Sequence, residues 1–398
     1  MDSSIFALVL TPALTELLPK SGIAVSPASL GLWGGVGFAL FLVGWGLSTL
    51  WGPVADRFGR ARTLMWTILV YSLFTFLAGF AQNVWELMLF RFLAGLGIGG
   101  EWSMGGTFVA EEWPESRRKM GAGYLHTGYY IGFVVAALLN LFVTPAFGWR
   151  VMFWIGIIPA FLVAFIRYGV REPERWQRVG TQTRREGFGR FLSGIFAPHY
   201  LRRTVGNALL LSVAMIGLWA GTVYLPTAIT QLATAAGLDK VTTVHLASYG
   251  TMLTAAFTVV GCLLMPLLAE RIGRRATLAF MFLCMFVAVA GDFGWVFYHG
   301  TVRSFYYLLP VLGLGGADFA VFTLWLPEQY STDVRATAFA FATSIGRFLG
   351  AAITFLVGAG VSYFHSLGTP IALTSVAFLV GLALLGLAPE TRGHALPD

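Results

Sequence analysis

The sequence predicts an all-α membrane protein with twelve transmembrane helices in two pseudo-symmetric sets of six. The chain has 398 residues, of which 57% are hydrophobic and only 11% are charged, and its mean hydropathy is +0.74. Apolar runs long enough to cross a bilayer, about 20 residues each, recur along it, and a charged motif interrupts them once in each half. The runs lack the strict alternation of β-barrel strands, which favours helices.

The twelve spans are the apolar runs that lie between charged residues and Pro or Gly breaks. In order, they cover residues 3–18, 28–51, 63–80, 84–110, 119–143, 149–168, 204–232, 244–268, 276–297, 304–326, 336–361 and 370–388. The first has about 16 residues and reaches about 24 Å, which is short for a bilayer. We therefore expect the first helix to be incomplete, either because residues upstream of Met1 are missing or because the span is truncated.

The charged motif marks an internal repeat. Its first copy contains Gly52, Asp56, Arg57, Gly59 and Arg60. Its second copy, about 214 residues later, contains Glu270, Arg271, Gly273 and Arg274. Two further segments match each other, from Glu111 to Arg118 and from Glu328 to Arg335. We expect a first six-helix bundle over 1–168, a cytoplasmic linker over 169–203, a second bundle over 204–390 and a cytoplasmic tail over 391–398.

The basic residues indicate topology. The formal net charge is +7, but most Lys and Arg residues fall in alternate loops, which the positive-inside rule places in the cytoplasm together with the C-terminus. A charge distributed in this way predicts no nucleic-acid partner. Cys262 and Cys284 lie inside predicted spans, so we expect no disulfide, metal site or cofactor.

The two motif copies resemble the loop between the second and third helices of each half in the major facilitator superfamily, whose pattern is Gly-x-x-x-Asp-Arg-x-Gly-Arg-Arg/Lys. The second copy departs from it, with Pro266 for the leading Gly and Glu270 for Asp. Residues 91–102 are similar to the fourth helix of proton-coupled metabolite, sialate and aromatic-acid symporters, and residues 389–393 resemble the ending of sugar porters.

The resemblance implies the major facilitator fold, with a central cavity between bundles that move by alternating access. It also implies that Asp56, Arg60, Glu111 and Arg118 form a cytoplasmic clasp that gates the transporter. The second-copy residues, with Glu328 and Arg335, are the matching gating positions of the other half.

Placing a charged residue at membrane depth costs several kcal/mol of free energy, so we expect each such residue to have a structural or functional role. We expect two acid–base pairs at similar depth, Glu101 with His126 and Asp318 with Arg347. They are either static pairs or include a carboxylate that carries the coupled proton, because opening a water path changes the proton occupancy of such a group. Asp2 is a further proton-coupling candidate if residues are missing upstream, and a solvated terminus otherwise.

Arg91 and Arg347 are the candidates for binding a substrate carboxylate, because a guanidinium can hold it by two hydrogen bonds. The alternative for Arg91 is that it snorkels toward the membrane surface or pairs with a neighbouring carbonyl. Weaker candidates for the cavity wall are Tyr130, Trp219, Tyr224 and Gln231.

Together these features predict a secondary transporter that carries a small organic anion, such as a sialic, aromatic or other metabolite acid, with protons. A neutral-sugar symporter and a drug or metabolite exporter are the alternatives. We expect no enzyme, because zinc-hydrolase, serine-hydrolase and phosphate-loop motifs are absent from the sequence. The expected setting is a monomer in a bacterial inner membrane, with the solute, protons and lipid as its partners.

Overall fold

The computed structural model describes residues 2–47, 51, 54, 60–112, 118–163, 165, 194–330 and 332–393. Apart from turns and short connections, these residues are helical. The first half of the chain forms helices at the predicted places. They are α1 (Asp2–Lys20), α2 (Pro27–Leu47), α4 (Arg60–Ala78), α5 (Val84–Glu112), α6 (Arg118–Phe147), α7 (Trp149–Ile155) and the 3₁₀ turn η2 (Ile158–Phe161).

The second half contains long helices and spans made of several segments. They are α11 (Pro198–Ile216), η4 (Gly217–Thr222), α12 (Leu225–Ala235), α13 (Lys240–Ile272), α14 (Arg274–Gly291), η5 (Asp292–Val296), α15 (Phe297–His299), α16 (Val302–Phe305), α17 (Leu309–Gly315), α18 (Asp318–Trp325), η6 (Pro327–Gln329), α19 (Thr332–Phe364), α20 (Gly368–Thr374), α21 (Val376–Leu384) and η7 (Leu385–Leu387). Helix α11 begins at Pro198, inside the segment expected to be linker.

Within the described ranges, nine helical stretches are long and apolar enough to cross a membrane. Helices α1 and α5 and the shorter apolar stretch Trp149–Phe161 occupy the places of the other three predicted spans. Two spans contain π-helical turns, η4 and η5, which the apolar runs did not reveal. Such turns interrupt the regular hydrogen-bond ladder and often lie at functional sites.

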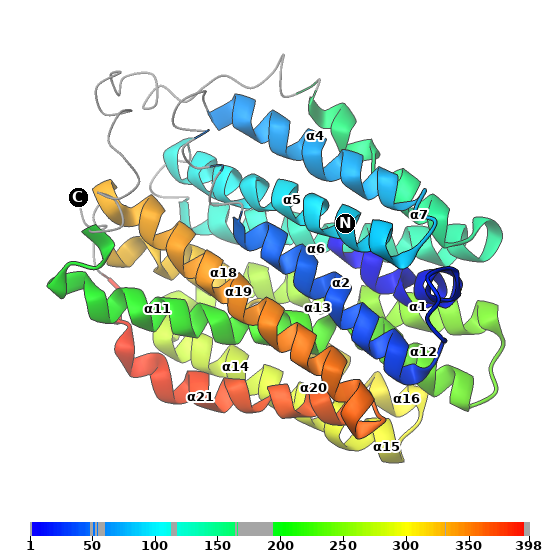
Figure 1. The fold of residues 1–398 in the computed structure, drawn as a ribbon. Helices are drawn as coiled ribbons and strands as arrows, with labels where there is room; N and C mark the ends of the chain where they lie inside the picture. The colour runs from blue at the N-terminus through cyan, green and yellow to red at the C-terminus, as the bar shows by residue number, and fades with distance from the viewer. Residues whose placement is uncertain are drawn as a thin grey trace.

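Helices α2 and α19, from opposite halves of the chain, lie side by side (Figure 1). Glycines allow this close approach: a Cβ added at Gly35 would be 2.8 Å from Cα of Gly358. We call the end of the molecule that carries residues 21–26 the outer end, because the positive charges predict that it faces outside. Gly35 lies in the half of α2 nearest this end, so the two halves are closed against each other there.

Helix α6 makes a second seam between the halves, against α13. Toward the outer end, Asn140 donates a hydrogen bond to Ser248 Oγ at 2.9 Å. Toward the other end, a Cβ added at Gly123 would be 3.0 Å from the carbonyl oxygen of Cys262. One of these contacts is a neutral hydrogen bond and the other is a close approach of a glycine to the facing backbone. A neutral hydrogen bond contributes about 0.5–1.5 kcal/mol to stability, so such a contact alone holds the two halves together only weakly.

Ionic hydrogen bonds connect the helices at the outer end of the first half. Glu16 of α1 accepts hydrogen bonds from Arg150 Nη1 at 2.6 Å and Trp149 Nε1 at 2.9 Å. Arg150 also donates to the carbonyl of Ala81, before α5. These bonds thus join α1, α7 and the connection between α4 and α5, all from the same half of the chain.

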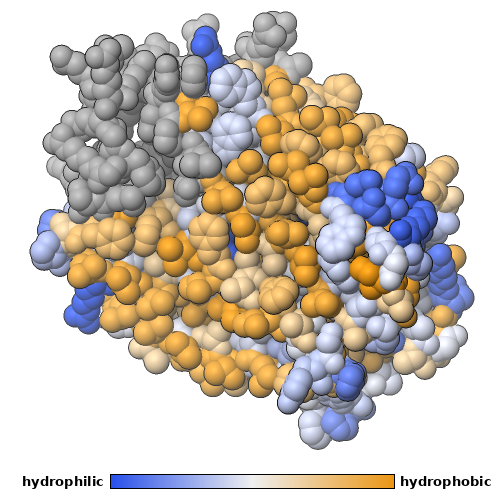
Figure 2. Space-filling model, in the orientation of Figure 1, coloured by the Kyte–Doolittle hydropathy of each residue, from blue (hydrophilic) through white to orange (hydrophobic). Residues whose placement is uncertain are grey.

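The surface of the molecule is apolar, as a lipid environment requires. Figure 2 shows a face covered mostly by hydrophobic residues, with hydrophilic ones mainly toward its edges. Large side chains such as Phe142, Leu267 and Leu356 are more than half exposed on three different helices. Apolar exposure on this scale marks a membrane-facing surface and not that of a soluble monomer.

A valine at Gly35 should open the outer end, because its side chain cannot fit against Gly358. A single cysteine at Leu30, in a background with Cys262 and Cys284 replaced by alanine, should then react several-fold faster with a membrane-impermeant maleimide. Gly386→Val is the control, since an added Cβ there meets nothing within 4 Å. Unchanged labelling of a protein that still unfolds cooperatively would contradict this account of the seam.

Candidate functional site

An aromatic cluster lies where the two halves meet in the middle of the molecule. Phe38, Phe41 and Trp45 of α2 surround Trp219 of η4, with ring centroids 6.2, 5.7 and 5.8 Å from the Trp219 ring. Phe6 of α1 extends it, 4.7 Å from Phe38. All five side chains are buried, and tilted or edge-on pairs of this kind are favourable beyond their burial. We call these five residues the aromatic cluster.

Two buried guanidinium groups stack on this cluster, one from each half of the chain. Arg91 of α5 is 0% exposed, and its Cζ lies 4.8 Å from the Phe6 ring and 4.5 Å from the Phe41 ring. Arg347 of α19 is 3% exposed, and its Cζ lies 4.6 Å from the Trp45 ring. Ring faces attract cations, by about 2 kcal/mol or more when water is excluded. The burial of Arg91 contradicts the alternative in which it snorkels to the membrane surface; its role in binding a solute stays a prediction.

Helix α6 contacts the second half beside these groups. His126 Nε2 lies 2.6 Å from Thr323 Oγ1 of α18, and Tyr130 donates its hydroxyl to the carbonyl of Gly316 at 2.8 Å. Two residues later stands Asp318, which is 1% exposed. Within the described part of the chain, neither of its carboxylate oxygens makes a hydrogen bond to another side chain.

The expected hydrogen-bonded pair between Asp318 and Arg347 is therefore not formed in this structure. The Arg347 guanidinium stacks on Trp45 instead. The pair was predicted because the two residues lie at similar depth in their spans, and depth alone does not show which way a side chain points. Glu101 is half-buried on α5. The side chain of Asp2 lies outside the described part of the structure, so its role stays a prediction.

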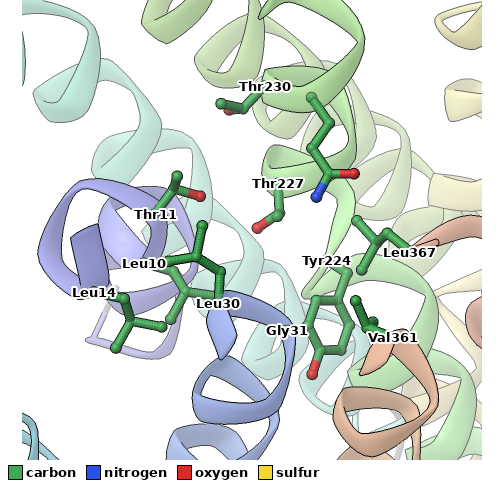
Figure 3. A pocket seen from close by; sticks show the side chains of 11 residues that line it. Leu10, Thr11, Leu14, Leu30, Gly31, Tyr224, Thr227, Thr230, Val361 and Leu367 are labelled. Atoms are coloured by element: carbon green, nitrogen blue, oxygen red, sulfur yellow. The ribbon is translucent and has the colours of Figure 1, made fainter. Parts of the chain in front are cut away.

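Two of the weaker candidates, Tyr224 and Gln231, line a cavity nearer the outer end (Figure 3). Tyr224 is also 6.1 Å from Phe38, centroid to centroid, so the cavity borders the aromatic cluster. Trp219 is a member of the cluster itself. Thr323 and Thr227 were not predicted, because a threonine in an apolar run carries no distinguishing signal.

The second motif copy forms a charged cluster within the second half. Arg274, 2% exposed, donates to Glu328 through Nη2 at 2.7 Å and Nε at 2.9 Å. Glu270, 47% exposed, lies 3.6 Å from Arg274 Nη1, and Thr391 donates its hydroxyl to Glu328 at 2.5 Å. Arg271 is exposed.

Gly273 and Glu390 complete this cluster. Gly273 has φ of 92°, a conformation that favours glycine. The turn directs the backbone N–H groups of Arg274 and Arg275 to the Glu390 carboxylate, at 3.0 Å each. Burial opposes the charge of Glu390, but these donors with those of Thr391 and Arg392 outweigh it and hold the pKa of its carboxyl below the ordinary 4.5.

Glu390 had no predicted role, although its place after the last span, at the same end as the motif, could have suggested one. The first motif copy cannot be compared. Gly52, Asp56, Arg57 and Gly59 lie outside the described residues, as do the side chains of Arg60, Glu111, Arg118 and Arg335.

Comparison with known proteins now decides the family. The model of the Major Facilitator Superfamily matches residues 1–355. The chain belongs to this superfamily. The resemblance noted in the sequence and the predicted fold class are thereby confirmed, and the protein is a multi-pass membrane transporter.

Its relatives include named solute transporters. The probable 4-methylmuconolactone transporter of Cupriavidus pinatubonensis is 34% identical over 100% of this chain and 89% of that protein. A putative metabolite transport protein of Haemophilus influenzae is 32% identical over 87% and 84%. Other relatives are named for sialic acid, cis,cis-muconate and niacin. A crystal structure of the D-xylose–proton symporter superimposes with a TM-score of 0.73 at 17% identity over 99% of this chain and 96% of that one, which supports the fold alone.

Replacing Glu390 with glutamine should lower the unfolding temperature most at neutral pH. The folded-state pKa of Glu390 lies below its ordinary value, so its stabilising effect is present above about 4.5 and is lost as the pH falls through the folded-state pKa. Thermal unfolding in detergent between pH 3.5 and 7 should show the two proteins converging at the acid end. Glu270→Gln, at a half-exposed carboxylate, should have a smaller effect. A difference independent of pH would contradict the assignment.

Proposed function

We propose that this transporter carries a small organic anion together with protons across a bacterial inner membrane, by alternating access of its two halves. The observation that carries the proposal is the pair of buried guanidinium groups, Arg91 and Arg347, stacked on one aromatic cluster from opposite halves. The names of its relatives, which include organic-acid transporters, support the same class of solute.

Electrostatics favours an anion at this place. A buried cation is costly at membrane depth, and contacts with ring faces offset part of that cost. A carboxylate would offset more, because a charge-assisted hydrogen bond is worth about 1.5–3 kcal/mol and a guanidinium can make two in parallel. Since Arg91 and Arg347 come from different halves, an anion held by both would favour a closed arrangement.

Asp318 and His126 are our candidates for the proton. Asp318 is buried without a side-chain hydrogen-bond partner in the described part of the chain, and His126 of the first half contacts Thr323 of the second. A buried group of this type changes its proton occupancy when a water path reaches it. Movement of the seam would provide that path, so proton and solute exchange would share one conformational change.

Neutral-sugar symport is the second candidate, favoured by the ending at residues 389–393. Within this ending, however, Glu390 accepts hydrogen bonds from the start of α14 and Thr391 donates to Glu328. These contacts give the ending a structural role far from the aromatic cluster in sequence and on another set of helices. The ending therefore favours no particular solute.

Thermal stabilisation of the purified protein tests the anion. The panel is sialic acids, aromatic acids, dicarboxylates, the matching primary amides and hexoses. We expect stabilisation by one acid class and none by its amide. In Arg347→Gln the affinity should fall about tenfold or more, as loss of a charge-assisted hydrogen bond predicts.

Arg303→Gln is the matched control, because Arg303 is exposed at the outer end in α16 and should leave binding unchanged. Stabilisation by a hexose, equal in wild type and Arg347→Gln, would contradict the anion proposal and support the sugar.

A further inference from the structure

Three arginine side chains gather around the short stretch of chain that follows α21. Arg202, near the start of α11, donates from Nη2 to the carbonyl of Gly386 at 3.3 Å. Arg275, near the start of α14, donates from Nε to the carbonyl of Ala388 at 2.7 Å. The third, Arg392, belongs to this stretch itself and is exposed. We call these three residues the arginine rim.

The helices that carry the rim pack around α21, so its members lie at one end of the second half. The carbonyls of residues 386 and 388 are two residues apart, which places their Cα atoms at most about 7 Å from each other. A Cβ added at Gly381 of α21 would be 2.7 Å from Phe282 of α14 and 2.9 Å from Val213 of α11. Figure 1 shows α11 and α21 side by side.

No acidic side chain neutralises the rim within the described part of the chain. None of its three guanidinium groups forms an ion pair there. The carboxylate of the same stretch, Glu390, is held instead by backbone N–H groups, those of Arg274, Arg275, Thr391 and Arg392. An arginine has five N–H donors, and a carbonyl bond occupies only one, so the rim keeps donors for an anion from outside the protein.

An exposed apolar surface begins directly beside the rim. Val205 of α11 is 42% exposed, Phe280 of α14 is 46% exposed and Val380 of α21 is 50% exposed. Each lies within about two helical turns of the end of its helix at the rim. Positive charge beside apolar surface matches a phospholipid, which carries a phosphate at the membrane surface and acyl chains below it.

We infer that the arginine rim binds the headgroup of an anionic phospholipid, whose acyl chains lie against the exposed sides of α11, α14 and α21. A guanidinium fits a phosphate by two parallel hydrogen bonds. The positive charges predict that this end faces the cytoplasm, where the leaflet carries anionic lipids and basic sites between helices bind their headgroups. The bound lipid would tie together the ends of three helices of the second half, whatever solute is carried.

Lipid titration of the purified full-length protein in a nonionic detergent tests the rim, with bound lipids counted by native mass spectrometry. The probes are phosphatidylglycerol and phosphatidylcholine with identical acyl chains. We expect a site that phosphatidylglycerol fills and phosphatidylcholine does not. Replacing both Arg202 and Arg275 with glutamine should weaken this binding at least about fivefold, the contribution of one arginine near an anionic surface.

The matched control is Arg271→Gln combined with Arg303→Gln, which removes the same charge from two exposed arginines outside the rim and should keep the affinity. If the first double variant does not fold, Arg392→Gln gives the same test, because its side chain makes no hydrogen bond within the described chain, and it should also weaken binding about fivefold. Equal weakening in the control, or equal filling by phosphatidylcholine, would overturn the inference. Displacement of the lipid by glycerol 3-phosphate would show a free-phosphate site and overturn it too.

Discussion

The buried positive charge at the meeting of the two halves is the constraint on which the rest of the site depends. Arg91 and Arg347 are almost fully buried. A buried carboxylate can become neutral by binding a proton, but an arginine side chain stays protonated and keeps its charge. Aromatic rings of α1 and α2 stack against them, which reduces the cost of burial. On the proposed function, an anion that enters this place would replace part of its hydration with fixed donors and would draw the two halves together.

The two kinds of contact in the molecule suit a protein whose halves move against each other. Within a half, the contacts are charged and partly buried: Glu16 with Arg150 in the first, and Arg274 with Glu328 in the second. Removing one partner of a buried pair costs about 3–5 kcal/mol; this applies to Arg274 with Glu328 and not to the more exposed Glu16 with Arg150. Between the halves, the described contacts include glycine seams and neutral hydrogen bonds such as Asn140 with Ser248, each of these hydrogen bonds about 0.5–1.5 kcal/mol. The aromatic cluster and the stacking of Arg347 on Trp45 join the halves as well. The two ion pairs named above each lie within a single half.

The sequence was sufficient for the spans, because a bilayer fixes the length and apolarity of any helix that crosses it. It was also sufficient to find the buried charges, because they interrupt apolar runs. It did not reveal their partners. Arg347 stacks on Trp45 rather than pairing with Asp318, and this depends on the relative rotation and tilt of α2, α18 and α19. The π turn at η4, which places Trp219, and the capping role of Glu390 likewise depend on contacts between distant segments.

The most direct test of the account is proton movement coupled to solute movement. The purified protein is reconstituted in liposomes with a trapped pH indicator, and the acid that stabilises it is added outside at zero membrane potential. Beyond the rate in protein-free liposomes, the wild type should acidify the lumen as it takes up the acid, whereas Asp318→Asn should exchange labelled acid without moving protons. Uptake at the full rate with no change in the lumen pH, or proton movement unaltered in Asp318→Asn, would contradict the account.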